Sequence, residues 1–202
     1  MPNELPVNSP DFVVGIGASA GGIEPVKILF TRFKHDSTAF VLAMHLSPDH
    51  RSHLAEVLQK YCSLELTMLE APTTPIARNN VYLVPPAASV TLEDGALVLG
   101  PLGPQPRRTI DTLFLSLAAE LGERSIGIVL SGLGSDGAVG LKAIRKAGGL
   151  TFVQSPQSAE FSSMPQSAKG SARFSMEPAA LGDELMARIA NGWAAPVPSP
   201  TP

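Results

Sequence analysis

The sequence is poor in several features that define whole classes of protein. Its single cysteine, Cys62, cannot form a disulfide within the chain, so we expect a buried thiol and no disulfide-built secreted domain. Charged residues make up only 16% and the net charge is −3, so no basic surface predicts binding to nucleic acid or anionic lipid. No apolar run approaches the roughly 18 residues that a membrane-spanning helix needs. We therefore expect neither nucleic acid nor membrane insertion.

Aromatic residues are also scarce, at 5%, whereas the chain holds 18 glycines and 19 prolines. Its 202 residues suit one compact domain or two small ones, long enough to bury a core without a metal or a disulfide. The first ten residues, MPNELPVNSP, lack the cationic and apolar regions of a signal peptide, which favours a cytoplasmic protein. The last eight, APVPSPTP, favour an extended conformation. We expect a flexible leader over residues 1–10, a folded domain over 11–192 and a proline-rich tail or linker stump over 193–202.

Between these ends, strand and helix patterns alternate along the chain. Short apolar runs such as FVVGIG (12–17) indicate strands buried on both faces, and segments with helical spacing lie between them. The pair Asp94-Gly95 separates two strand-like runs and predicts a β-hairpin. The expected fold class is α/β, an open, doubly wound, mostly parallel sheet with helices on both faces and an antiparallel β-hairpin at one edge. Strands are expected over residues 12–17, 39–45, 64–69, 81–84, 89–92, 96–100, 125–130 and 150–153, and helices over 22–33, 52–62, 109–121 and 138–147.

The first buried strand runs into the sequence GASAG (17–21), which has the form G-x-S-x-G. Between a strand and a helix this is the nucleophile-elbow pattern, because its glycines permit a sharp turn that exposes the hydroxyl of Ser19. The N–H of Ala20 would then point to the place where an oxyanion forms. A simpler interpretation is a glycine-rich turn in which Ser19 is only a helix N-cap.

The same segment also satisfies the G-x-G-x-x-G/A pattern of dinucleotide-binding proteins, from Gly15 to Ala20. That pattern needs an acidic residue at the end of the second strand to bind the ribose hydroxyls. Here the second strand ends in MHL (44–46), and the nearest acids, Asp36 and Asp49, lie outside it. The nucleotide interpretation therefore lacks its third element, and no cofactor is expected.

His45 ends the strand expected to lie beside the first one. Adjacent parallel strands are about 5 Å apart, so this imidazole could come within hydrogen-bonding distance of Ser19 and serve as its general base. A metal site is also conceivable, but its spacing matches no established ligand pattern, and no metal is expected. That site would use His45, Asp49, His50 and His53.

Asp136 lies in the glycine cluster GLGSDG (132–137), after a third buried strand. The cluster also has the form G-x-G-x-x-G, which again suggests phosphate binding. A carboxylate that the helix dipole keeps ionised suits the orientation of an imidazole better. As an N-cap alone, Asp136 would also have a sufficient structural role. The case for catalysis is the conjunction, because Ser19, His45 and Asp136 each end a different buried strand.

Several segments, in this order along the chain, resemble one known family, the catalytic domain of chemotaxis protein-glutamate methylesterase (CheB). The likeness extends over roughly residues 11 to 180, and the motifs SAGG (19–22) and HLSPDH (45–50) are most similar to the methylesterase part of fused methylesterase-methyltransferase sensory proteins. The segments that carry it are GIGASAGG (15–22), the strand ending at His45, NNVYLVPP (79–86), RRTIDTLF (107–114), VLSGLGSDGAVGLKAIRKAGG (129–149) and SSMPQSA (162–168).

The resemblance implies that residues 11–192 are a catalytic domain of the CheB type, a serine hydrolase of a two-component chemotaxis system. Its substrate would be glutamate methyl esters on the cytoplasmic helices of methyl-accepting chemoreceptors, and it would also deamidate receptor glutamines. The nucleophile falls on Ser19, the base on His45 and the orienting acid on Asp136, with Ala20 and Leu133 at the oxyanion or substrate. We expect a monomer that works with fused or separate methyltransferase or sensor-kinase domains.

The sequence departs from the family at three positions. Leu46 and Leu133 replace methionines that are common in it, which conserves apolar bulk and would shift substrate fit without removing catalysis. Thr109 stands where a proline is common. Stand-alone members carry an N-terminal receiver domain, for which these residues leave no room, so we expect no phosphorylation control within this chain. A competing hypothesis is a catalytically silent sensory or docking module of a larger signalling protein. If the triad is correct, Ser19→Ala or His45→Ala abolishes activity, and Asp136→Asn weakens it while sparing the fold.

Overall fold

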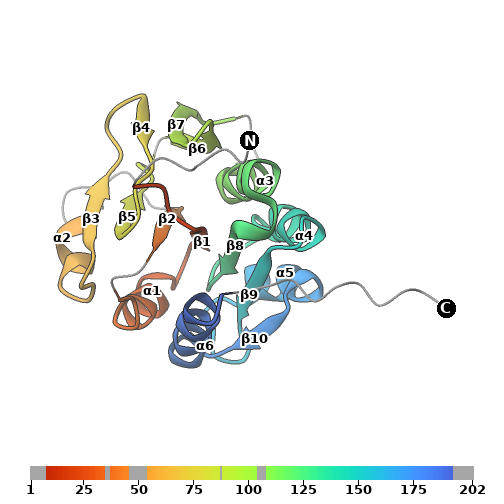
Figure 1. Ribbon diagram of the computed structural model, residues 1–202. Coiled ribbons are helices and arrows are strands. Elements are labelled where there is room, and N and C mark those ends of the chain that lie inside the picture. The colour runs from red at the N-terminus through yellow and green to blue at the C-terminus, as the bar shows by residue number, and fades with distance from the viewer. Residues whose placement is uncertain (1–7, 35–36, 46–53, 87, 104–107, 193–202) are drawn as a thin grey trace.

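The computed structural model describes residues 8–34, 37–45, 54–86, 88–103 and 108–192 (Figure 1). Most of the expected leader and all of the expected tail lie outside these ranges. Seven strands form a sheet in the order β10-β9-β8-β1-β2-β5-β3, and all of its strand pairs are parallel. The strands are β1 (Phe12–Ala18), β2 (Thr38–Met44), β3 (Glu65–Met68), β5 (Asn80–Leu83), β8 (Ser125–Val129), β9 (Leu150–Gln154) and β10 (Phe174–Met176).

The strand order reverses at the centre of this sheet. The chain extends it from β1 through β2 on one side and from β8 through β9 and β10 on the other. In doubly wound sheets, the carboxyl ends of the strands at such a reversal flank the ligand-binding crevice. Ala18 is level with Met44 across β1 and β2, and Gly17 is level with Val129 across β1 and β8. The residues that follow these three strands therefore leave the sheet at the same level.

Helices cover both faces of the parallel sheet, as predicted (Figure 1). One face packs against α1 (Ile23–Phe30), α2 (Leu54–Gln59) and α6 (Pro178–Ala190). The other packs against α3 (Thr109–Leu121), α4 (Ala138–Lys146) and α5 (Ser163–Ala168). Two short 3₁₀ helices, η2 (Gly122–Arg124) and η3 (Lys169–Ser171), complete the set. Each face thus has its own hydrophobic core.

Packing explains the glycines of the dinucleotide-like pattern. A Cβ at Gly15 would lie 2.8 Å from side-chain atoms of both Leu117 and Phe114, and one at Gly17 would collide with Ile110. Successive residues of a strand point to opposite faces, so both glycines face α3. They allow α3 to pack directly on β1, and this packing accounts for both glycines without a bound nucleotide.

The predicted hairpin is confirmed, but its place in the fold differs from the prediction. Strands β6 (Ala88–Glu93) and β7 (Ala96–Pro101) turn at Asp94 and Gly95, whose φ angles are 48° and 75°. With β4 (Thr73–Pro75) they form a separate antiparallel sheet of three strands. The hairpin cannot extend the parallel sheet where the chain leaves β5, because β5 is already paired with β2 on one side and β3 on the other. It packs instead on α3, where Leu92 N–H donates to Ser116 Oγ at 2.9 Å.

Helix and strand positions otherwise follow the predictions closely up to residue 153. The helix expected over residues 52–62 is shorter in the structure, with residues 52 and 53 outside the described ranges, and Cys62 just beyond it is a free, buried thiol whose pKa is raised by burial. The elements α5, β10 and α6, together with β4, were not predicted. Among the described residues, no helix has the length and apolar character needed to cross a membrane.

Candidate active site

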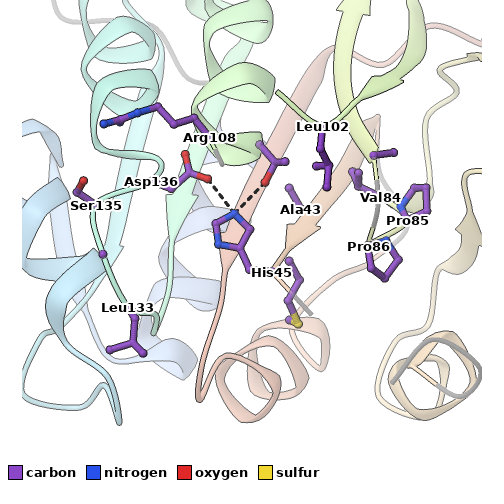
Figure 2. Close-up of a pocket in the computed structure, with 14 residues that line it drawn as sticks. Ala43, His45, Val84, Pro85, Pro86, Leu102, Arg108, Leu133, Ser135 and Asp136 are labelled. Atoms are coloured by element: carbon purple, nitrogen blue, oxygen red, sulfur yellow. Dashed lines mark hydrogen bonds and ion pairs between the residues drawn. The ribbon is translucent and has the colours of Figure 1, made fainter. Parts of the chain in front are cut away.

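His45 and Asp136 are in direct contact at the carboxyl end of the parallel sheet. His45 follows β2, Asp136 lies in the turn after β8, and His45 Nε2 is 2.9 Å from Asp136 Oδ2 (Figure 2). The side chain of Asp136 is only 6% exposed and that of His45 is 28% exposed. The structure therefore brings together two of the three residues that were predicted from separate strand ends.

The Asp136 carboxylate accepts hydrogen bonds from the start of α3. Its Oδ2 accepts from Ile110 N–H at 3.0 Å, and its Oδ1 accepts from Asp111 N–H and Gly137 N–H, both at 2.9 Å. Burial alone would raise the pKa of Asp136, but the hydrogen bonds from His45 and from the Asp111 and Ile110 N–H groups outweigh it and lower the pKa. Asp136 is thus held as a carboxylate.

This arrangement corrects the expectation that Asp136 caps its own following helix. The N-cap of α4 is Gly137, whose φ of 90° is accessible to glycine and which has no side chain of its own to cap the helix. The carboxylate instead binds the first turn of α3, where the helix dipole also favours a negative charge. The electrostatic argument from the sequence holds, but the helix concerned is a different one.

Asp111 makes the reciprocal connection from α3 to α4. Its Oδ1 accepts from Gly140 N–H at 2.8 Å, and its Oδ2 accepts from Arg108 Nη1 at 2.9 Å. Asp111 is 2% exposed. An acid in the first turn of a helix is favourable because of the helix dipole. In the structure, Asp136 and Asp111 each satisfy the N-terminal amides of the other's helix, which joins α3 and α4 behind the site.

Ser19 lies at the end of β1, beside the backbone of His45. His45 N–H donates to Ala18 O at 3.1 Å, so the two chain segments leave the sheet together. The N-cap of α1 is Gly22, and no side-chain hydrogen bond caps this helix, so the interpretation of Ser19 as its N-cap is wrong. Within the described part of the chain, no hydrogen bond joins Ser19 Oγ to His45. Such bonds are often long before substrate binds.

The peptide after Ser19 is oriented by its neighbours. Ser19 O accepts from Gly22 N–H at 2.9 Å, and the planar trans peptide therefore turns Ala20 N–H the opposite way. Neither Ala20 N–H nor Leu133 N–H has an acceptor among the described residues. The Leu133 side chain is 58% exposed. Both amides are thus available to a bound oxygen, as the sequence argument for Ala20 required.

A buried polar network holds the Ser19 turn in place from beneath. Ser131 O accepts from Ser19 N–H at 3.0 Å, and the Ser131 hydroxyl donates to Ala20 O at 2.9 Å. Ser131 is fully buried, and its own N–H donates to Gln154 Oε1 at 2.8 Å. This network was not predicted, because neither Ser131 nor Gln154 belongs to a local pattern.

Gly132 allows this close packing, and we expect Gly132→Ala to disturb it. An added Cβ would overlap Met164 Sδ and lie 2.8 Å from Ser19 Cβ. Overpacking of this kind costs about 1–3 kcal/mol. The variant should therefore unfold at a lower temperature and label more slowly with a serine-directed fluorophosphonate. Gly170→Ala is the matched control, because its Cβ would have no atom within 4 Å. Equal melting temperatures for both variants would contradict the expectation.

A cavity of about 430 Å³ opens beside His45. In Figure 2, Pro85, Pro86 and Leu102 form an apolar wall, and Leu133, Ser135 and Asp136 lie on the opposite side. Ser19 is not among the lining residues. The conceivable metal site from the sequence includes residues 49, 50 and 53, which lie outside the described ranges. In the part of the chain that is described, no three acidic, histidine or cysteine side chains are grouped to bind a metal ion.

A doubly wound sheet with a histidine–carboxylate pair beside a G-x-S-x-G turn is typical of α/β enzymes that use a serine nucleophile. A family model described as CheB methylesterase matches residues 14–185 of this chain. The chain belongs to the CheB methylesterase family. Its fold agrees with the crystal structure of the Thermotoga maritima CheB methylesterase catalytic domain, with a TM-score of 0.77 at 20% identity, over 87% of this chain and 97% of that one.

Curated relatives cover most of this chain. Protein-glutamate methylesterase/protein-glutamine glutaminase 3 of Burkholderia thailandensis is 35% identical over 162 residues, which are 77% of this chain and 45% of that protein. A protein-glutamate methylesterase/protein-glutamine glutaminase of Yersinia pestis is 29% identical over 203 residues, 96% of this chain and 58% of that protein. The chain therefore spans about half the length of the curated relatives that it matches.

Proposed function

We propose that this chain is a serine hydrolase that removes methyl esters from glutamates on the cytoplasmic helices of chemoreceptors. The observation that carries the proposal is the 2.9 Å contact between His45 and Asp136, at the end of the strand beside Ser19, in a member of the CheB methylesterase family. The relatives named protein-glutamate methylesterase/protein-glutamine glutaminase support both ester hydrolysis and deamidation of glutamine.

In the proposed reaction, Ser19 Oγ attacks the ester carbonyl carbon and passes its proton to His45. The oxyanion receives hydrogen bonds from Ala20 N–H and Leu133 N–H, which are unpaired among the described residues. The carbon–oxygen bond to the methoxy group breaks, and methanol leaves with the proton from His45. Water activated by His45 then hydrolyses the acyl-enzyme and releases glutamate. With glutamine as substrate, ammonia leaves in place of methanol.

Asp136 stabilises the imidazolium that forms in each half of this reaction. Its lowered pKa keeps it ionised, and its contact with Nε2 assigns the proton of neutral His45 to that nitrogen. The lone pair then lies on Nδ1, which is the basic atom in the proposal. The apolar wall of Pro85, Pro86 and Leu102 suits the uncharged aliphatic ester side chain.

The proposal extends to the cellular setting of the chain. We propose that residues 11–192 act as the catalytic unit, as a monomer in the cytoplasm, on the cytoplasmic domain of a methyl-accepting receptor. Methyltransferase or sensor-kinase domains would be fused to it or act beside it. The family match over residues 14–185 supports the extent of this unit.

Methanol release from a purified, methylated receptor cytoplasmic fragment tests the proposal, with fluorophosphonate labelling of Ser19 as a second measurement. We expect methanol release together with an adduct at Ser19. An adduct without methanol release would keep the serine nucleophile and reject the receptor ester as substrate. The absence of both would favour a catalytically silent docking module.

A further inference from the structure

A second oxygen lies beside His45 Nε2, the ring nitrogen that contacts Asp136. Thr109 Oγ1 is 2.9 Å from His45 Nε2, the same distance as Asp136 Oδ2 (Figure 2). Thr109 is the first residue of α3 and is 8% exposed. We propose that Thr109 is a positioning residue that holds His45 in its reactive orientation, an inference that rests on the proposed function of this site.

The protonation states define what the Thr109 hydroxyl does. Asp136 is a carboxylate and can only accept a hydrogen bond, so His45 Nε2 must carry the proton that it donates. Thr109 Oγ1 faces the same N–H and is therefore a second acceptor. The Nε2 proton is shared between two oxygens, and the lone pair of the ring lies on Nδ1.

A second acceptor gives His45 Nε2–H a hydrogen-bond partner that is not already shared with backbone N–H groups, as the Asp136 carboxylate is. Each oxygen of the carboxylate already accepts from backbone N–H groups, and Oδ2 is shared between Ile110 N–H and His45. Thr109 offers another oxygen from the same helix start. Two acceptors disfavour rotation of the imidazole by half a turn, because a C–H group would then face both oxygens. They also remain bonded to Nε2–H when His45 becomes a cation.

The Thr109 hydroxyl has no capping role within the described structure. The N–H groups of Ile110 and Asp111 donate to Asp136, and Thr112 N–H donates to Arg108 O. Arg108 is the N-cap of α3, and its own side chain makes no capping hydrogen bond. The contact with His45 is therefore the one hydrogen bond that the described residues give to the Thr109 side chain.

Fluorophosphonate labelling tests this role without any knowledge of the natural substrate. Ser19 Oγ bonds to phosphorus, fluoride leaves, and His45 takes the serine proton, so the second-order rate constant reports on the base. We expect Thr109→Val to lower this rate about tenfold, since one buried hydrogen bond is lost. Thr109→Ser should restore it to near the wild-type rate. Thr112→Val is the matched control, because among the described residues the Thr112 hydroxyl donates only to Arg108 O, at 2.8 Å.

A Thr109→Val variant that labels at the wild-type rate would overturn the inference. A Thr109→Ser variant that labels as slowly as the valine variant would also overturn it. An unlabelled wild type would instead reject the proposed nucleophile itself, so the two failures are distinguishable. Nuclear magnetic resonance of isotopically labelled histidine tests the geometry without a variant. We expect neutral His45 to carry its proton on Nε2, and an Nδ1–H tautomer would contradict the shared hydrogen bond.

Discussion

Replacing Ser19 by alanine is expected to remove ester hydrolysis and leave the fold intact. Loss of a serine nucleophile lowers kcat by about 10⁶-fold. Stability should change by less than about 0.5 kcal/mol, because Ser19 Oγ has no hydrogen-bond partner among the described residues and the turn is held by backbone groups. The measurements are methanol release, fluorophosphonate labelling and thermal unfolding.

Ser135→Ala is the matched control for this variant. Ser135 is an exposed serine that lines the cavity beside His45, but it lies on the turn before Asp136 rather than at the end of β1. Its replacement should change hydrolysis only slightly. Retained hydrolysis in Ser19→Ala, or an equal loss in Ser135→Ala, would show that the nucleophile has been assigned to the wrong residue.

Asp136→Asn is expected to lower both activity and stability, which differs from the effect that the sequence suggested. Activity should fall by about 10²- to 10⁴-fold, because the amide no longer stabilises the imidazolium or fixes its tautomer. The carboxylate also accepts three backbone N–H groups. An asparagine would place its NH₂ group against some of them, at a cost of about 1–3 kcal/mol.

The pH dependence of unfolding tests the contribution of the ionised Asp136 carboxylate to stability separately from its contribution to activity. The pKa of Asp136 is lowered in the folded state, so its stabilising contribution is complete above its ordinary pKa of 3.8 and is lost as the pH falls through the lower folded-state value. The difference in unfolding free energy between wild type and Asp136→Asn should therefore shrink as the pH falls below 3.8.

Asp183→Asn is the control for this titration, because Asp183 lies on α6 with a side chain that is 64% exposed. It should leave the pH dependence nearly unchanged. A difference between wild type and Asp136→Asn that does not shrink in acid would contradict the role of the ionised carboxylate.

Local sequence was sufficient to predict the framework of this fold. Apolar runs marked the buried strands, and α3 has the bounds that its helical spacing indicated. The three-residue strand β10 and the six-residue helix α5 are too short to produce a periodic pattern. Helix α6 was missed although Leu181, Leu185 and Ile189 recur at helical spacing, and that pattern could have revealed it. The placement of the hairpin in its own sheet depended on the strand order, which local patterns do not contain.

For the site, the sequence predicted only which residues lie at the carboxyl ends of strands. Each candidate residue could be placed at a carboxyl end, and parallel topology then predicted that the three lie near each other. The partner of the Asp136 carboxylate could not be predicted, because α3 is far from residue 136 in the sequence. The contact between Thr109 and His45 likewise joins residues 64 positions apart. Such pairings follow from how α3 packs on β1, which depends on the core as a whole.

The exchange of hydrogen bonds between Asp136 and Asp111 affects how non-enzymatic descendants of this fold should be recognised. A protein that lost hydrolysis and kept the scaffold for docking would still need both carboxylates to join its two helices. Ser19 Oγ joins no structural elements among the described residues. Substitutions that accumulate after hydrolysis is lost should therefore replace Ser19 first. Of the three proposed catalytic positions, the acid is therefore the weakest marker of an active enzyme, and the serine is the strongest.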